Sequence, residues 1–354
     1  MSNQNSYFIK EQQQNTKKLR SLIKDLPSFC EEYFRGIEHT TSILTRINYA
    51  YDLRIFFDYL INQETDDFPG LPSSDFALEH LNQIQVIHIE KFLEYITYYT
   101  NPNNIQQDRQ NSEMGKARKL ASIRSLLSYF YKKEKIDRNV AHLVDMPKLA
   151  EKPIIRLDVD EVAKLLDAVE SGDKLTPTQL RYHKYTKTRD LAILSLLLGT
   201  GIRISECIGL NLTDFDFKNN SFKVIRKGGD QEILYYSDEV KNAILDYMEK
   251  RKQIEIRPGH ESALFLSIQR RRISHRALQN LVQKYAKVVS PLKKITPHKL
   301  RSTYGTTLYQ ETGDIYLVAD VLGHKDVNTT RKHYAAISEE KRRIAARVVK
   351  LRED

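Results

Sequence analysis

A short segment with two prolines, MPKLAEKPII at residues 146–155, divides this chain of 354 residues into two parts. The residue before a proline favours extended backbone, so a run with two prolines and weak hydrophobic periodicity predicts a linker. Each flanking part is long enough to bury a hydrophobic core of its own. We therefore expect one domain at residues 21–145 and a second at residues 156–354. The preceding residues 1–20 are expected to form a flexible segment or an accessory helix.

The first part shows the periodicity of helices. Aromatic and aliphatic residues recur at helical spacing in residues 40–62, 85–99 and 112–135. Such spacing predicts amphipathic helices that pack through one face. Polar stretches separate them, and the stretch at residues 101–111 is expected to be a loop. The first domain is therefore expected to be a small all-helical bundle.

The second part mixes helical and strand patterns. Residues 158–170 and 188–198 have the apolar spacing of helices, and Thr296 and Pro297 mark the start of another. Within residues 217–236, two β-like runs, FKVIR and EILYY, flank the turn residues KGGD, which predicts a β-hairpin. The fold class is therefore expected to be mainly α with a small β-sheet or hairpin, which makes the second domain a mixed α/β domain.

Charge is distributed unevenly along the chain. The formal net charge is +10, whereas residues 1–150 carry 19 basic and 19 acidic side chains, so the whole excess lies in residues 151–354. A basic domain attracts polyphosphates and makes their binding salt-dependent. The charge therefore favours a nucleic-acid partner, although a generally basic surface would give the same count.

Cysteine usage and the N-terminus indicate the compartment. Cys30 and Cys207 are the two cysteines of the chain, too few for a disulfide framework or a cysteine-rich zinc site. The N-terminus is polar and lacks the apolar run of a signal peptide, and no stretch reaches the length of a membrane span. We therefore expect a cytoplasmic protein without a membrane segment.

Six ionisable residues of the second part together suit the cleavage of a phosphodiester without a metal. Two guanidinium groups can hold one phosphate from both sides. Histidine transfers protons near neutral pH, a lysine can donate to a leaving alkoxide, and a tyrosine can act as an oxygen nucleophile. Taken singly, each residue also has an ordinary structural explanation. The six are Arg203, Lys227, His298, Arg301, His324 and Tyr334.

The segments around these residues, GTGIRISE, VIRKGGDQ, TPHKLR, VLGHKD and TTRKHY, resemble in order and spacing the active-site motifs of the tyrosine recombinase family. This family includes the Xer recombinases and the phage integrases, and the resemblance covers about residues 154–350. It implies that Arg203 and Arg301 clamp the scissile phosphate and that Lys227 is the general acid. Tyr334 would attack to give a 3′-phosphotyrosyl enzyme.

The same resemblance places His298 and His324 in the phosphate pocket and implies that neither a metal nor another cofactor is needed, because the covalent link conserves the phosphodiester energy. The chain departs from the family pattern at three points. Ser302 follows Arg301 where the family usually has histidine, and Cys207 stands after Ser205-Glu206 where the family often has leucine. The interval from His324 to Tyr334 is one residue longer than the commonest spacing.

Basic residues outside this set are candidates for DNA contacts. Residues 116–138 carry eight basic and two acidic side chains, which indicates the DNA-facing surface of the first domain. The triple arginine at residues 270–272 suits phosphates, whereas Arg276 and Gln279, at the start of a predicted helix, suit base edges in the major groove. Ordinary solvated surfaces are the alternative. The candidates are Lys116, Arg118, Lys119, Arg124, Arg270, Arg271, Arg272, Arg276 and Gln279.

The resemblance also implies how the chain would work. Its two lobes would close as a clamp on double-stranded DNA with inverted-repeat half-sites, and a homotetramer on two such sites would exchange strands through a Holliday junction. The terminal helix expected at residues 338–351 would either pack on its own core or dock on a neighbouring protomer. The overall length is similar to that of the Xer class, which resolves chromosome dimers at a dif-like site, and most of all to that of single-recombinase XerH-type systems. A DNA translocase is a candidate regulator.

Three alternatives stay open at this point. A mobile-element integrase would use the same chemistry at other sites. A sequence-specific DNA-binding protein would bind without cleaving, and a type IB topoisomerase would relax supercoils as a monomer. Covalent trapping on DNA separates the binding protein from the enzymes.

Overall fold

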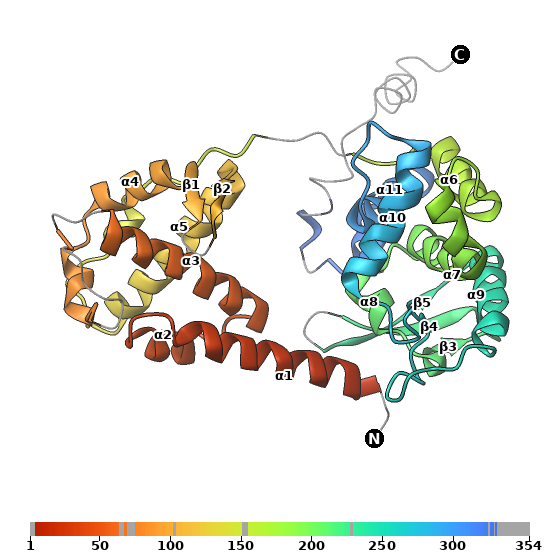
Figure 1. Cartoon of the computed structure of the whole chain (residues 1–354), viewed down its shortest axis with the longest axis horizontal. Coiled ribbons are helices and arrows are strands. Elements are labelled where there is room, and N and C mark those ends of the chain that lie inside the picture. Colours follow the sequence, from red (N-terminus) through yellow and green to blue (C-terminus); the bar gives the residue numbers. More distant parts are fainter. Residues whose placement is uncertain are drawn as a thin grey trace, which may run out of the picture. The chain divides into compact units, whose positions relative to one another are not determined.

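Two compact units make up the chain, one spanning Asn5–Lys152 and the other Pro153–Asp354. The boundary between them falls inside the segment expected to be the linker. Lys227, Tyr334 and the expected terminal helix at residues 338–351 lie outside the described residues. The structure, a computed structural model drawn in Figure 1, describes residues 4–63, 67–68, 75–101, 104–150, 155–226, 229–324, 326–328 and 330.

The first unit is built from helices and one hairpin. The three helices expected from periodicity are present as α3, α4 and α5, and a further helix, α1, covers most of the first twenty residues. The elements are α1 (Gln4–Ile23), α2 (Cys30–Gly36), α3 (Ile43–Asn62), η1 (Leu78–Gln83), α4 (Val86–Tyr95), β1 (Tyr98–Asn101), β2 (Asn104–Gln110), α5 (Glu113–Lys132) and η2 (Val140–His142).

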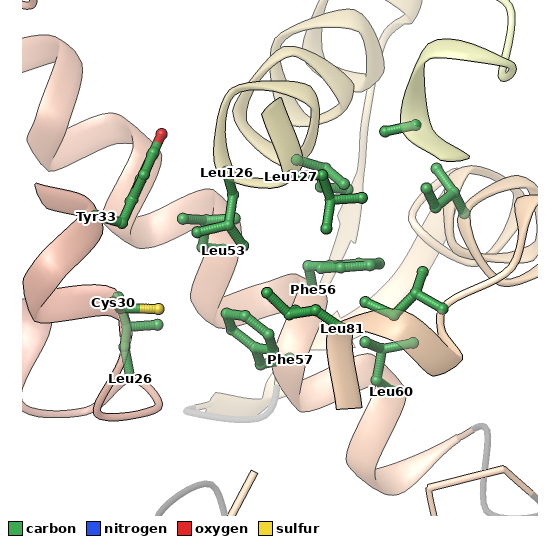
Figure 2. Packing of buried hydrophobic residues seen from close by; sticks show 14 of the residues in the cluster. Leu26, Cys30, Tyr33, Leu53, Phe56, Phe57, Leu60, Leu81, Leu126 and Leu127 are labelled. Carbon is green, nitrogen blue, oxygen red and sulfur yellow. The ribbon is translucent and has the colours of Figure 1, made fainter. Parts of the chain in front are cut away.

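The core of this unit lies between α3, α5 and their neighbours, as Figure 2 shows for the labelled side chains. Leu53, Phe56 and Leu60 are fully buried along one face of α3. On α5, residues at helical spacing, Leu120, Ile123, Leu127 and Phe130, are buried as well. Burial of these apolar side chains, rather than helix propensity, stabilises the bundle.

An all-helical first domain was the wrong expectation, because β1 and β2 form an antiparallel hairpin where a loop was predicted. Tyr98 pairs with Gln110 and Thr100 with Asp108. The second strand, NIQQDRQ, has few apolar residues and no alternating pattern. Its backbone is nevertheless satisfied by cross-strand hydrogen bonds, which a search for hydrophobic periodicity cannot detect.

The second unit is mainly helical with a small antiparallel sheet of strand order β3-β4-β5, which confirms the predicted fold class. The expected hairpin is formed by β4 and β5. The elements are α6 (Val159–Ser171), α7 (Pro177–Thr200), α8 (Ile204–Gly209), η3 (Leu212–Asp214), β3 (Phe215–Asp216), β4 (Ser221–Ile225), β5 (Gln231–Tyr235), α9 (Asp238–Arg251), α10 (His275–Val289), α11 (Pro297–Thr312) and α12 (Ile315–Leu322).

Helix α7 is the centre of this unit and packs against α6, α9 and α11. From Ala192 to Leu197 its residues are buried on all sides, which is typical of a central helix. It is longer than the predicted helix at 188–198, because it begins at Pro177 behind the N-cap Thr176, in a polar and largely exposed stretch without apolar spacing. In the described part of the chain, no helix is both long and apolar enough to cross a membrane.

Candidate active site

The turn after α7 delivers Arg203. The helix ends at Thr200, and Gly201 adopts a left-handed conformation with φ of 62°, a region that favours glycine. This turn places Arg203 at the N-cap of α8. There its main-chain N–H and its Nη1 donate to the two carboxylate oxygens of Glu206, both at 2.8 Å, while its Nη2 donates to the carbonyl of Gly323 at 2.9 Å. The guanidinium is thus held from two sides.

Arg301 reaches the same place from α11. The side chain is buried, and its Nη1 donates to the carbonyl of Gly201 at 2.7 Å. Its Nη2 donates to the carbonyl of Leu322, the residue directly before Gly323. Two arginines from distant parts of the sequence therefore converge on the end of α12. Paired guanidinium groups of this kind can hold a phosphate bidentately.

His324 follows the same helix end. Gly323 turns the chain with φ of 60°, and the main-chain N–H of His324 donates to the carbonyl of Ala319 at 2.9 Å. The Nδ1 atom of His324 shares a hydrogen bond of 2.8 Å with the hydroxyl of the buried Thr330. This bond orients the imidazole ring, because the partner of one ring nitrogen fixes the direction of the other.

His298 lies on the first turn of α11, three residues before Arg301, and is exposed. Residues at this spacing project from one face of a helix. Ser302, which stands where the family usually has histidine, is buried, and its hydroxyl donates to the carbonyl of His298 at 3.1 Å. The serine hydroxyl therefore bonds within its own helix.

Sequence reasoning missed the carboxylate network behind Arg203. The buried Glu206 also accepts a bond of 3.1 Å from Arg226, which in turn donates to Glu232. Burial alone would lower the pKa of the Arg226 guanidinium, but its bonds to Glu232 and the charge of Glu206 raise it. The signal available in the sequence was Glu206 three residues after Arg203, the spacing of a capping box.

The candidate DNA contacts of the first unit differ in exposure. Lys119 is buried, with its ammonium 2.8 Å from the Asn111 side-chain oxygen and 3.9 Å from Asp52. Arg118, almost half exposed, pairs with Asp52 at 2.5 Å. Burial raises the pKa of Asp52 to about 6 despite both cations. We therefore assign Lys119 an internal role, whereas a DNA contact by Arg118 stays a prediction.

Two more candidates of this helix have partners within the unit. Arg124 donates through Nε to the carbonyl of Ala141 at 3.0 Å and through Nη2 to that of Val144, which ties α5 to η2 and to the segment after it. Lys116 pairs with Glu113 at 3.0 Å, one turn away on the helix surface. The Lys116 side chain is only 15% exposed, and phosphate binding by it stays a prediction.

The basic turn before α10 contains two kinds of arginine. Arg272 donates to the carbonyls of Ile208 and Leu210 at 2.8 and 2.9 Å, so its side chain fixes the main chain at the end of α8. Arg270 pairs with the exposed Glu255, and Arg271 bonds to Gln269. DNA contacts by the last two stay predictions.

At the start of α10, Arg276 is exposed and Gln279 is partly buried. Arg276, with Arg189, Arg271 and Lys284, lines a cavity of about 720 Å³ that opens beside the helix start. Arg189 and Lys284 pair with the buried Asp190 at 2.7 and 2.9 Å, whereas the exposed Arg276 suits an anionic ligand such as a DNA phosphate.

Comparison with known proteins defines the class. Residues 155–341 match the model of the phage integrase family. A tyrosine recombinase XerC of Caldanaerobacter subterraneus subsp. tengcongensis is 33% identical over 289 residues, which cover 80% of this chain and 75% of the relative. The chain belongs to the phage integrase family. It is a tyrosine recombinase, an enzyme that transfers DNA strands.

Other relatives extend the likeness to the full length. A tyrosine recombinase XerS of Lactococcus lactis is 27% identical over 350 residues, which cover 93% of this chain and 96% of the relative. Among solved structures, the XerH recombinase bound to difH substrate has a TM-score of 0.62 at 19% identity, over 87% of this chain and 80% of that one. The Tn1549 transposon integrase with circular intermediate DNA has a TM-score of 0.62 at 18% identity, over 90% and 98%. These structures share the fold.

Proposed function

We propose that this recombinase resolves chromosome dimers at a dif-like site in the cytoplasm. The likeness to Xer recombinases supports this role, because it runs over almost the whole chain, including the first unit. A structural neighbour, XerH, was solved on its difH substrate and on a palindromic form of it, which supports the proposal of a double-stranded DNA substrate with inverted-repeat half-sites. A homotetramer on two such sites, regulated by a DNA translocase, would complete the system.

The convergence of Arg203 and Arg301 on the end of α12 is the observation that carries the proposed chemistry. In this mechanism both guanidinium groups bind the scissile phosphate and stabilise the charge that builds up on its oxygens. The hydroxyl of Tyr334 loses its proton and attacks phosphorus, so that the bond from phosphorus to the tyrosine oxygen forms. The bond to the 5′ oxygen breaks, and Lys227 donates a proton to that oxygen.

His298 and His324 complete the phosphate pocket in this proposal. An imidazole can either donate a proton to a phosphate oxygen or accept the tyrosine proton. The 3′-phosphotyrosyl intermediate is then attacked by the free 5′ hydroxyl of a partner strand. One phosphodiester is exchanged for another at each step, so the bond energy is conserved.

A mobile-element integrase is the second candidate. The Tn1549 transposon integrase has the same fold, with a TM-score similar to that of XerH. Fold alone therefore does not distinguish the two roles. The full-length likeness to XerS favours the chromosomal role, and the position of the recombination site in the host genome would decide between them.

The test uses short duplexes that carry a nick near the scissile position, so that the small cleaved piece diffuses away and the covalent adduct accumulates. Candidate sites come from the host chromosome. We expect the wild-type chain to form an adduct that survives denaturing gels, whereas the Tyr334→Phe variant binds the same DNA and forms none. Tight binding without any adduct would contradict the proposed chemistry and favour the non-cleaving DNA-binding protein.

A further inference from the structure

Arg226 lies at the base of the β4–β5 hairpin, directly before Lys227 in the sequence. Its main-chain N–H donates to the carbonyl of Asp230 at 2.8 Å, and its own carbonyl accepts a bond of 3.0 Å from the N–H of Gly229. Both bonds bridge the turn that follows β4. The main chain is therefore fixed at the residue from which Lys227 continues.

The side chain of Arg226 ties three elements together. It donates through Nε and Nη2 to both oxygens of Glu232 on β5, at 2.6 and 2.9 Å. It also donates through Nη1 to Glu206 on α8 at 3.1 Å, and through Nη2 to the carbonyl of Val321 on α12 at 2.9 Å. Arginine suits such a junction because its planar group carries donors in fixed directions.

Arg226 belongs to the interior of the unit and is not a phosphate ligand by its geometry. Its side chain is only 7% exposed, compared with 32% for that of Arg203. Glu206 shares one carboxylate between the two, with Oε1 toward Arg203 and Oε2 toward Arg226. The two guanidinium groups are thus connected through one buried carboxylate, which fixes the position of each relative to the other.

The end of α12 fits closely against the same guanidinium. A Cβ atom added to Gly323 would lie 2.8 Å from Nε and 2.9 Å from Cζ of Arg226. The carbonyl of Gly323 is the one that binds Arg203. Arg226 therefore contacts both groups that hold Arg203, the carboxylate of Glu206 and the turn at Gly323.

We propose that Arg226 is a positioning residue for strand cleavage, which fixes the base of the Lys227 turn against the carboxylate that holds Arg203. This inference rests on the proposed roles of Lys227 as general acid and Arg203 as phosphate ligand. A general acid acts only within hydrogen-bond reach of the leaving oxygen. Misplacement by about 1 Å can cost about 10²-fold in rate, so a residue that touches no DNA can control the step.

A substrate that needs no general acid separates positioning from general structural damage. In a duplex with sulfur in place of the bridging 5′ oxygen, attack by Tyr334 breaks the bond from phosphorus to sulfur. The electron pair leaves with a thiolate, which needs no proton in order to leave, because a thiol is far more acidic than an alcohol; bulk solvent protonates it afterwards. Lys227→Ala is the reference variant, and its cleavage defect is expected to shrink on this substrate.

The main test variant is Arg226→Lys, which keeps the positive charge but cannot bond Glu206, Glu232 and Val321 together. On the ordinary nicked duplex we expect a loss of single-turnover cleavage of about tenfold or more, with DNA affinity within about twofold of wild type because no DNA contact is removed. On the sulfur-bridged duplex the part of the defect that acts through Lys227 should disappear, so the defect should shrink, as for Lys227→Ala. Arg226→Met is the second variant. Lys223→Met, three residues earlier on β4, controls for loss of a cation from the hairpin and should match wild type.

Several outcomes would overturn the inference. These are full activity of Arg226→Lys and Arg226→Met, an equal defect on both substrates, or a parallel loss of DNA affinity and thermal stability in both variants. A failure of the proposed function would look different: the wild-type chain would form no adduct on either duplex. If the wild type cleaves and Lys227→Ala is rescued by sulfur while Arg226→Lys is not, only the role of Arg226 fails.

Discussion

The guanidinium groups of Arg203 and Arg301 donate hydrogen bonds to consecutive main-chain carbonyls, those of Gly323 and Leu322. Because these carbonyls belong to adjacent residues, the end of α12 sets the distance between the two arginines. The same turn leads directly into His324. Three candidate catalytic residues thus depend on one helix end, although they come from three different segments of the chain.

We expect Arg203→Lys and Arg301→Lys each to lower single-turnover cleavage by about 10²-fold or more, because an ammonium group cannot hold a phosphate bidentately. The two variants should differ in stability. Arg301 is buried, so its replacement leaves carbonyls without donors at a cost of about 1–3 kcal/mol. The Arg203 side chain is about one third exposed, so Arg203→Lys should lower the free energy of unfolding by less than Arg301→Lys does. Adduct formation and urea unfolding measure the two effects, and normal cleavage by Arg301→Lys would refute the clamp.

Gly323 and Gly313 offer a matched pair, because both end a helix with a left-handed φ, of 60° and 69°. A Cβ at Gly313 would meet nothing within 4 Å, whereas at Gly323 it would meet the Arg226 guanidinium. Gly313→Ala should therefore cost only the backbone strain, about 1 kcal/mol, and leave cleavage unchanged. Gly323→Ala should cost more and also slow cleavage, as measured by urea unfolding and adduct formation. Equal effects of the two changes would show that contact with Arg226 does not matter.

Arg272 and Arg276 are four residues apart but should behave differently. Arg276 is exposed at the start of α10, so Arg276→Ala should leave stability unchanged and weaken discrimination against a mismatched base pair, by about 1–3 kcal/mol. Arg272→Ala removes bonds to the carbonyls of Ile208 and Leu210, so it should destabilise the second unit. Binding titrations on matched and altered duplexes, with thermal melts of both variants, test this. Unchanged discrimination by Arg276→Ala would assign that residue to the solvated surface.

Motifs and periodicity predicted much of this structure. The helices α3, α5 and α6 follow from apolar spacing, and the β4–β5 hairpin follows from two β-like runs around KGGD. Short motifs also singled out Arg203, Arg301 and His324 as candidates, and the structure brings these three residues to one helix end, while their catalytic roles stay predictions. The helices and the hairpin could be predicted because their signal is local, within one helix turn or one hairpin.

Interactions between distant segments could not be predicted in this way. Arg226 and Glu206 are 20 residues apart in the sequence. Only the folded chain shows that Glu206 forms ion pairs with both Arg226 and Arg203. Lys119 was predicted to face DNA as part of a basic helix face, yet it is buried, with its ammonium near Asp52 of α3 and Asn111 after the unexpected hairpin. Charge in a sequence does not reveal burial when the partner lies on another element.

Acid sensitivity is expected from Glu161, which joins the start of α6 to the segment after α10. Its carboxylate accepts bonds from Lys293 at 2.6 Å, from the Ser290 hydroxyl and from the main-chain N–H of Asp158 at 2.8 Å. Burial alone would raise the pKa of Glu161, but the bonds from Lys293 and Ser290 lower it from 4.5 to about 2.

Because this pKa is lower in the folded state than in the unfolded state, the unfolded state binds more protons between the two values. The stabilisation is therefore fully present above a pH of about 4.5 and is lost as the pH falls toward about 2. Glu161→Gln should be less stable than wild type at neutral pH, and the gap should narrow on acidification. Thermal melts between neutral pH and pH of about 3 measure it, with Glu170→Gln, an exposed residue at the other end of α6, as the control. A constant gap across this range would show that the carboxylate of Glu161 does not link α6 to Lys293 in solution.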